Sequence, residues 1–322
     1  MFVPILLFLL GFLLLIKGGD WFVDGATGIA HKFHIPEILI GATVVSIGTT
    51  LPEVMVSANS ALSGHGEIAY GNAIGSIICN TALIAAITVA VKPSKVERKS
   101  LILPVIFFFG AAVFYSAVAY ATGYFSRTVG FILTSIFLVY MIFSVLNARK
   151  SMIDGKDNSK EDDEDINIIN KIILLVVGAA VIAFGADLLV DNGIIIAQAI
   201  GVPEAVIGLT VVALGTSLPE FVTAITSLVK GHGALSLGNV IGANLFNLVL
   251  VSGVSTVLSP FAIPQSSAIN GVNTSLVVDI PVMFFVMSLL VIPTLIRGKL
   301  SRMQGIILLV TYVAFCIFQF TL

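Results

Sequence analysis

The sequence predicts an all-α polytopic membrane protein with ten transmembrane helices, and three observations predict it. Of the 322 residues, 57% are apolar and only 11% are charged, whereas about a quarter of the residues in a soluble domain carry a charge. Apolar runs long enough to cross a bilayer, about 20 residues each, recur along the whole chain. These runs are continuous rather than alternating, which favours helices over the strands of a barrel.

Ten apolar runs follow one another, so both termini fall on the same side of the membrane. No basic segment precedes the first run and no small-residue cleavage site follows it, so we expect a span there and not a signal peptide. The predicted spans are residues 2–30, 36–62, 68–91, 101–121, 125–147, 168–197, 203–229, 234–258, 275–296 and 303–321.

Basic residues give the predicted orientation. With the termini outside, fourteen Lys and Arg residues fall in cytoplasmic loops or helix ends, Arg127 lies outside and Lys17 lies within a span. The positive-inside rule therefore predicts a multi-pass protein of the plasma membrane with external termini. The longest polar stretch, residues 147–170, is then cytoplasmic. It lacks the spacing of an EF-hand, so we expect a solvated acidic linker.

The chain contains an internal repeat. Without any gap, the segment 41–53 aligns with 208–220 at nine of thirteen identical positions, and Gly71-Asn-Ala-Ile-Gly then aligns with Gly238-Asn-Val-Ile-Gly. We call this register the repeat alignment. Each half holds an odd number of spans, so the second crosses the membrane in the opposite sense, as in many secondary transporters. We therefore predict two inverted five-helix repeats, residues 1–147 and 168–322, joined by the linker 148–167.

The repeated motif carries oxygen ligands for a cation. Pro52 and Pro219 interrupt apolar spans, and proline leaves the carbonyl four residues earlier without its helical donor. The sequence thus predicts broken helices at the midplane, each followed at once by a carboxylate. The next helix of each half adds Asn80 or Asn247. Two carboxylates with carbonyl and hydroxyl oxygens suit Ca²⁺, and acids inside a membrane normally serve a function.

Other functions fit the sequence less well. As structural glue, protonated Glu53 and Glu220 would only join helices, which explains neither the duplication nor the paired prolines. An enzyme needs a catalytic motif, but the four histidines form no His-Glu-x-x-His and no Gly-x-Ser-x-Gly occurs. A passive channel usually relies on an oligomeric ring of ligands. The nearly balanced charge predicts no nucleic-acid partner, the two cysteines predict no metal centre, and we expect no cofactor.

The segments Gly-Thr-Thr-Leu-Pro-Glu and Gly-Thr-Ser-Leu-Pro-Glu, followed by Gly-Asn-x-Ile-Gly, resemble the signature repeats of the calcium/cation antiporter superfamily, most closely the prokaryotic sodium/calcium exchangers. The resemblance covers essentially the whole chain. It implies that Glu53 and Glu220 are the central calcium ligands, together with the carbonyls of Thr49 and Thr216. It also implies flanking sodium sites formed by Thr50, Ser217, Ser76, Asn80 and the carbonyls of Ser46 and Ala213.

Two positions depart from that pattern. Many exchangers of this family carry Asp where Asn247 stands and Ser where Ala243 stands. One sodium ligand is thereby lost, which leaves a calcium/proton antiporter as the alternative to sodium/calcium exchange. In either case we expect a monomer in the lipid bilayer that works by alternating access, with the long first and sixth helices sliding past a rigid core.

Some further polar residues have structural interpretations. Asp20 and Asp187 are expected to be hydrogen-bonded near helix interfaces, with Lys17 placed to pair with Asp20. His65 and His232 are expected to be turn residues, because each stands between two glycines.

Overall fold

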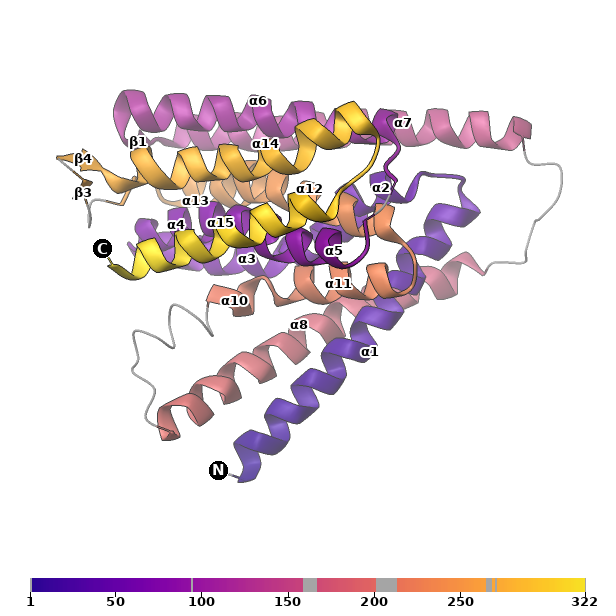
Figure 1. Ribbon diagram of the computed structural model, residues 1–322, viewed down its shortest axis with the longest axis horizontal. Helices are drawn as coiled ribbons and strands as arrows, with labels where there is room; N and C mark the ends of the chain where they lie inside the picture. The colour runs from indigo at the N-terminus through magenta and orange to yellow at the C-terminus, as the bar shows by residue number, and fades with distance from the viewer. Residues whose placement is uncertain are drawn as a thin grey trace.

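The computed structural model describes residues 2–93, 95–158, 167–200, 213–264, 268–269 and 271–321, and most of this backbone is helical (Figure 1). Within these residues, nine helical segments are long and apolar enough to cross a membrane. They match nine predicted spans and confirm a polytopic helical membrane protein: Phe2–Lys32, Glu37–Leu62, Gly66–Val91, Arg98–Thr122, Arg127–Ser151, Ile168–Ile196, Gly233–Leu258, Ser275–Arg297 and Arg302–Gln319.

The predicted span 203–229 lies partly outside the described residues. Its described part forms two short helices, α10 (Ala213–Thr216) and α11 (Leu218–Val229). The other helices are α1 (Phe2–Lys32), α2 (Glu37–Ile40), α3 (Ser46–Leu62), α4 (Gly66–Cys79), α5 (Ala86–Val91), α6 (Arg98–Thr122), α7 (Arg127–Asn158), α8 (Ile168–Ala199), α12 (Gly233–Phe246), α13 (Ser252–Leu258), α14 (Ile280–Arg297) and α15 (Arg302–Thr321).

Short strand pairs lie in the loops of the described chain. Strand β1 (Tyr124–Phe125) pairs antiparallel with β2 (Phe261–Ala262), and β3 (Ala268–Ile269) pairs antiparallel with β4 (Val272–Asn273). The first pair joins a loop of the first half to a loop of the second half.

Helices α1 and α8 form a closely packed pair that crosses the other helices at an angle (Figure 1). A Cβ added at Gly178 would lie 2.5 Å from the backbone nitrogen of Phe22, and one at Gly18 would lie 2.9 Å from that of Ile182. Small residues let membrane helices approach this closely. The seam consists of regularly spaced glycines, Gly11, Gly18 and Gly25 on α1 and Gly178 and Gly185 on α8.

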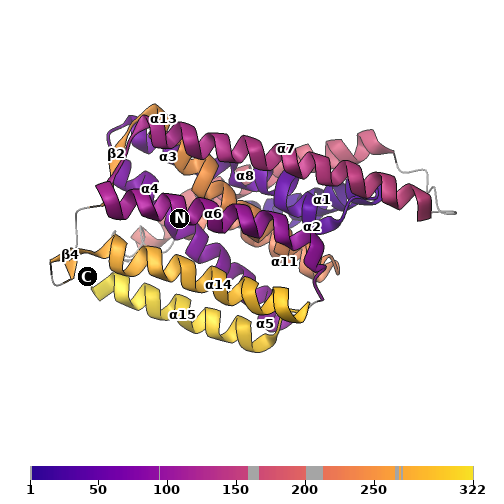
Figure 2. The same cartoon turned by 90° about the horizontal axis from the view of Figure 1, so that it is seen from above.

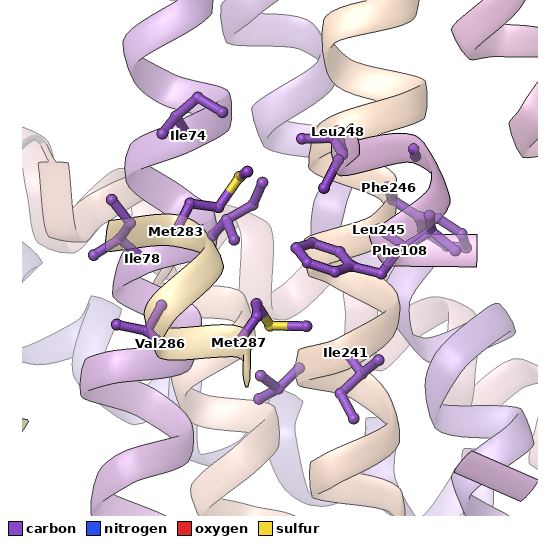
Figure 3. Close-up of a cluster of buried hydrophobic side chains, with 14 of the residues drawn as sticks. Ile74, Ile78, Phe108, Ile241, Leu245, Phe246, Leu248, Met283, Val286 and Met287 are labelled. Carbon is purple, nitrogen blue, oxygen red and sulfur yellow. The ribbon is translucent and has the colours of Figure 1, made fainter. Parts of the chain in front are cut away.

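The remaining helices share one apolar core. Figure 3 shows side chains of α4, α6, α12 and α14 converging, among them Ile78, Phe108, Leu245 and Met287, all of them completely buried. Lipid is as apolar as these side chains, so their packing is stabilised mainly by van der Waals contact. Figure 2 shows α14 and α15 side by side along one edge of the bundle and α7 along the opposite edge.

Four π-helical segments interrupt the α-helices of the described chain: η1 (Gly41–Val45), η2 (Asn80–Ala85), η4 (Asn247–Val251) and η5 (Ser275–Asp279). Segments η2 and η4 begin at Asn80 and Asn247, which are equivalent in the repeat alignment. A π-bulge changes the direction of the helix face that follows and occurs frequently at functional sites. Equivalent positions of the two halves therefore share this irregularity as well as their sequence.

The two repeated prolines have different surroundings, and the predicted break at Pro52 is wrong. Helix α3 continues through Pro52, because proline removes only one backbone donor and a buried membrane helix tolerates that loss. In the second half the break is present, but it comes before the proline. Ser217, with φ −94° and ψ 6°, separates α10 from α11, and Pro219 stands in the first turn of α11, where its missing N–H costs little.

Candidate functional site

Two fully buried glutamates lie at the centre of the molecule. Glu53 projects from α3 and Glu220 from α11, each with no exposed surface, and the two carboxyl groups are close enough to interact electrostatically. One oxygen, Oε1 of Glu220, accepts a hydrogen bond from the Thr50 hydroxyl at 3.4 Å. The other three carboxyl oxygens have no hydrogen-bond partner among the described residues. The sequence repeat thus predicted a pair of acids that the fold brings together.

Two asparagines follow the same pattern. Asn80 follows α4 and Asn247 follows α12, each as the first residue of a π-helical segment. Both are fully buried, and neither the oxygen nor the nitrogen of either amide has a hydrogen-bond partner within the described chain. A buried amide without partners costs free energy unless something else satisfies it. Two such amides at equivalent positions indicate a binding place for an ion or a polar ligand.

The predicted hydroxyl and carbonyl ligands have different environments. The Ser46 hydroxyl is already hydrogen-bonded, because its single proton has two carbonyl acceptors within reach, Gly41 at 2.7 Å and Asn239 at 3.0 Å. Ser217 is buried, and its hydroxyl has no partner among the described residues. Ser76 is buried in α4, and Ala213 begins α10.

Ser217 also borders a cavity of about 230 Å³ between α11 and the helix that holds Asn80. The cavity is otherwise apolar and is lined by Cys79, Leu83, Ile84, Ile87, Leu218 and Phe221. Among these described residues, Ser217 therefore contributes the only hydroxyl to the cavity wall.

The sequence interpretation missed Asn72 and Asn239, which lie in the repeated Gly-Asn-x-Ile-Gly segments. Asn239 accepts a hydrogen bond from the Thr49 hydroxyl at 3.2 Å, and Asn72 accepts one from the Thr216 hydroxyl at 3.5 Å. Each bond joins a helix of one half to a site segment of the other. The repeat alignment pairs the two asparagines and the two threonines, so the signal was present, but the contacts between them could not be read from it.

Other polar residues form contacts away from the glutamates. Asp20 lies 3.4 Å from Lys230, which also pairs with Asp24 at 2.8 Å, so the ion pair predicted with Lys17 is replaced by a contact between α1 and the end of α11. His65 and His232 precede α4 and α12, as turn residues do. His232 additionally contacts Glu37 at 2.7 Å.

Asp187 lines an apolar cavity of about 650 Å³ between α3 and α8, on whose wall Pro52 also lies. Asp187 therefore lies near a helix interface as predicted, between the α1 and α8 pair and the helix that holds Glu53, whereas its expected hydrogen bond stays a prediction.

The donor set at the centre favours hard cations. If both buried carboxyl groups were ionised and bound neither cations nor protons, two uncompensated charges would remain in a medium of low dielectric constant, which is costly. Oxygen atoms from carboxylates, amides and hydroxyls are the ligands that Ca²⁺ takes in sixes to eights. In the described residues, no group of three or more His, Cys, Asp or Glu side chains could hold a metal ion. Such a cation would therefore need neutral oxygen ligands in addition to the two acids.

A polytopic helical bundle with paired buried carboxylates is an arrangement expected of a membrane transporter of cations. The chain belongs to the sodium/calcium exchanger protein family, whose sequence profile matches residues 3–146 and 170–321. It is 29% identical to the sodium/calcium exchanger MaX1 of Methanosarcina acetivorans over 99% of both chains. It is also 34% identical to the uncharacterized membrane protein MJ0091 of Methanocaldococcus jannaschii, over 95% of this chain and 94% of that one.

Solved structures agree with the sequence relatives. The sodium-calcium exchanger NCX_Mj soaked with Na⁺ and Sr²⁺ matches 97% of both chains with a TM-score of 0.80 and 32% identity. Its form without Na⁺ and Ca²⁺ matches with a TM-score of 0.77. The relatives MaX1 and NCX_Mj are named as sodium/calcium exchangers, and the chain is a transporter of the cation/calcium antiporter class and not an enzyme.

Proposed function

We propose that this protein is a secondary active antiporter that exchanges Ca²⁺ for Na⁺ by alternating access. The observation that carries the proposal is the pair Glu53 and Glu220, fully buried and adjacent, with three carboxyl oxygens that no described residue satisfies. The relatives MaX1 and NCX_Mj, both named as sodium/calcium exchangers, support the same pair of ions.

In this proposal Ca²⁺ binds between the two glutamates and the carbonyls of Thr49 and Thr216. Sodium ions use the same centre and its flanks, where Thr50, Ser217, Ser76, Asn80 and the carbonyls of Ser46 and Ala213 supply oxygen. The unpartnered amide of Asn80 and hydroxyl of Ser217 fit this role. Asn247, with an equally unpartnered amide, completes the set on the second half.

The charge of the site explains why the protein would exchange cations and would not let them leak across the membrane. An empty site would carry two bare carboxylates into an occluded state, which is costly in low dielectric. The protein therefore changes its exposure only when cations neutralise both acids. The α1 and α8 pair, whose two helices are held together by the glycine seam, moves as a unit across the shared core in this scheme.

The wider architecture is part of the proposal. Ten spans form two inverted repeats, residues 1–147 and 168–322, with external termini in the plasma membrane, and the monomer is the working unit. Two separate family matches, residues 3–146 and 170–321, support this division. Residues 148–167 then act only as a linker, so deleting residues 156–164 should preserve Ca²⁺ flux in proteoliposomes. Complete loss of flux in folded protein would show that the linker has another role.

A calcium/proton antiporter is the second candidate, and the neutral residues at Asn247 and Ala243 favour it. Both are fully buried at positions where many exchangers of the family have an acid and a hydroxyl. With one sodium ligand fewer, Glu53 and Glu220 could instead carry protons on the return step.

Uptake of ⁴⁵Ca²⁺ into proteoliposomes separates the two candidates. An outward Na⁺ gradient at equal pH should drive uptake, and an outward H⁺ gradient without Na⁺ should not. The reverse pattern would establish the proton antiporter. Uptake under neither gradient would reject antiport by this site.

A further inference from the structure

Asn72 and Asn239 connect the two halves of the molecule beside the glutamates. Asn239 lies on α12 and is completely buried, and its side-chain oxygen accepts from Thr49 of α3 at 3.2 Å. Asn72 lies on α4, and its side-chain oxygen accepts from Thr216 of α10 at 3.5 Å. Both bonds therefore run between halves, and both end on residues whose carbonyls are proposed to bind Ca²⁺.

Each asparagine is itself held in place. The nitrogen of Asn72 donates to the Glu53 carbonyl at 3.3 Å and to the Ser57 hydroxyl at 2.8 Å, so one side chain contacts α3 twice and α10 once. The backbone carbonyl of Asn239 lies 3.0 Å from the Ser46 hydroxyl, whose single proton it shares with the Gly41 carbonyl at 2.7 Å.

Close helix packing fixes the position of Asn239 further. A Cβ at Gly238 would lie 2.3 Å from the Ile38 carbonyl oxygen, and one at Gly242 would lie 2.6 Å from Cα of Ala42. Helix α12 thus rests directly on the backbone of α2 and η1, and Asn239 has little freedom to move relative to Thr49.

These anchors matter because the segments they hold are intrinsically soft. Thr49 lies between Gly48 and Pro52, where the helix lacks one hydrogen bond, and Thr216 is the last residue of the short helix α10. A threonine hydroxyl has a single proton, and that of Thr49 has the Asn239 amide oxygen at 3.2 Å as a nearer acceptor than the Ser46 carbonyl at 3.4 Å. Donation to the amide oxygen ties the side chain, and the turn that carries it, to the opposite half. Groups that orient metal ligands in this way commonly change metal affinity about 10- to 100-fold when removed.

We propose that Asn72 and Asn239 are positioning residues that set the cation affinity and the size selectivity of the exchange site. By tying Thr49 and Thr216 to the opposite half, they fix the separation of the two carbonyl ligands and hence the size of the cavity. Selectivity among oxygen-bound divalent ions depends on cavity size and rigidity. This inference rests on the proposed function of the glutamate site.

The two anchors are unequal. Asn72 uses its nitrogen twice, whereas the nitrogen of Asn239 is buried without a partner among the described residues. The repeat alignment places Ala224 where Ser57 stands, so the second half lacks the hydroxyl that receives this donor in the first. The side-chain oxygen of Asn239 has the Thr49 hydroxyl at 3.2 Å and the more distant Ser46 hydroxyl at 3.4 Å, so the bond to Thr49 is its main anchor. We therefore expect Asn239→Ala to have the larger effect.

The test compares Asn239→Ala and Asn72→Ala with Asn244→Ala in proteoliposomes. Asn244 is a matched control, because it is also fully buried on α12 but donates to Thr81 at 2.7 Å within the apolar core. We expect Asn239→Ala to raise the KM for Ca²⁺ about 10-fold or more, with a smaller change in maximal rate. The preference for Ca²⁺ over Sr²⁺ should fall toward one. Asn244→Ala should lower thermal stability while leaving KM and the Ca²⁺ to Sr²⁺ ratio unchanged.

Thr49 provides the same test from the other end of the bond. Thr49→Val keeps the backbone carbonyl and the shape but removes the donor, so it should reproduce the change in KM, whereas Thr49→Ser, which keeps the donor, should shift KM much less. In the double variant Thr49→Val with Asn239→Ala, the effects should not add, because both remove one bond. The Thr49 variants also test the proposed positioning role if Asn239→Ala does not fold.

Two results would overturn different statements. If Asn239→Ala and Thr49→Val leave KM and the Ca²⁺ to Sr²⁺ ratio at the values of Asn244→Ala, the asparagines do not position the site. If Glu53→Gln transports Ca²⁺ normally in the same assay, the proposed site itself is wrong. The first failure leaves the second statement standing.

Discussion

The two halves share a motif but place it in different local structures. In the first half, Pro52 stands inside a continuous helix, α3. In the second half, Ser217 interrupts the chain and Pro219 begins a new helix, α11. The repeated motif therefore specifies which side chains lie at the candidate site. The packing of the surrounding helices determines how the backbone bends there. A proline predicts a missing hydrogen bond and not, by itself, a broken helix.

The halves also differ in which polar groups they contribute. The repeat alignment pairs Ser46 with Ala213, Ser57 with Ala224 and Ser76 with Ala243. At each of these positions the first half has a hydroxyl and the second half has a methyl group. The acids and asparagines are kept in both halves, so the centre is symmetric in its charges and amides but has hydroxyls mainly on one side.

The largest effect should come from the feature that the halves share. Glu53→Gln and Glu220→Gln should each abolish Ca²⁺ transport, because each removes one of the two charges that balance the divalent ion. Both variants should still fold and insert, since glutamine has nearly the same shape. Uptake of ⁴⁵Ca²⁺, with size-exclusion profiles as the folding control, measures this. Near-normal flux in either variant would contradict the equivalence of the two acids.

A large effect on stability is expected at Gly242, where α12 rests on the first half. A Cβ there would lie 2.3 Å from the Ser46 hydroxyl and 2.6 Å from Cα of Ala42. Gly242→Ala should therefore lower the free energy of unfolding by about 1 to 3 kcal/mol, seen as a lower melting temperature in detergent.

Gly110 of α6 is the matched control for this substitution. It is exposed, and apart from its chain neighbours and the nearby backbone of α6, no described atom lies within 4 Å of its added Cβ. Gly110→Ala should leave the melting temperature nearly unchanged. Equal melting temperatures for the two alanine variants would mean that the close approach at Gly242 is not needed.

Most of the fold could be predicted from the sequence, because a bilayer demands long apolar runs and backbone hydrogen bonds within each segment. Nine predicted spans match helices such as Arg98–Thr122, expected at 101–121. The remaining span, 203–229, lies partly outside the described residues. The π-helical segments were not predicted, since no residue type marks them.

The candidate site could be predicted only in its composition. The repeat showed that Glu53 and Glu220 are equivalent, and the fold brings them together. It did not show that Asn239 contacts Thr49 or that Lys230, not Lys17, faces Asp20. Equivalence in the repeat alignment is a property of the sequence, whereas contacts between halves depend on how the helices pack.

A moderate effect on the voltage dependence of exchange is expected from Asn247 and Ala243, where the second half departs from the family pattern. With Glu53 and Glu220 as the only fixed charges, Ca²⁺ or two Na⁺ would neutralise the site, and a third Na⁺ would leave net positive charge in low dielectric. We expect exchange near two Na⁺ per Ca²⁺ and therefore little dependence on voltage.

Restoring the family residues at positions 247 and 243 gives a second test of the expected stoichiometry. Asn247→Asp with Ala243→Ser should increase the voltage dependence of Ca²⁺ uptake, measured with the potential clamped by K⁺ and valinomycin. A wild-type reversal potential that requires three Na⁺ per Ca²⁺ would refute the expectation. An unchanged voltage response after restoration would show that these two positions do not set the stoichiometry.

The smallest effect concerns a contact that only one half can make. Lys230 lies 2.8 Å from Asp24 and 3.4 Å from Asp20, which joins the end of α11 to α1, and the equivalent position in the first half is Ser63. These side chains are 25% to 48% exposed, and such ion pairs are usually worth less than about 1 kcal/mol. Lys230→Ser, which gives the second half the residue of the first, should therefore lower the melting temperature only slightly. The loss should shrink at high salt, because screening already weakens the pair, and Lys230→Arg should restore the wild-type value. A large loss that salt does not change would mean that Lys230 is held by more than its two acids, and that the ends of the two repeats differ in packing as well as in charge.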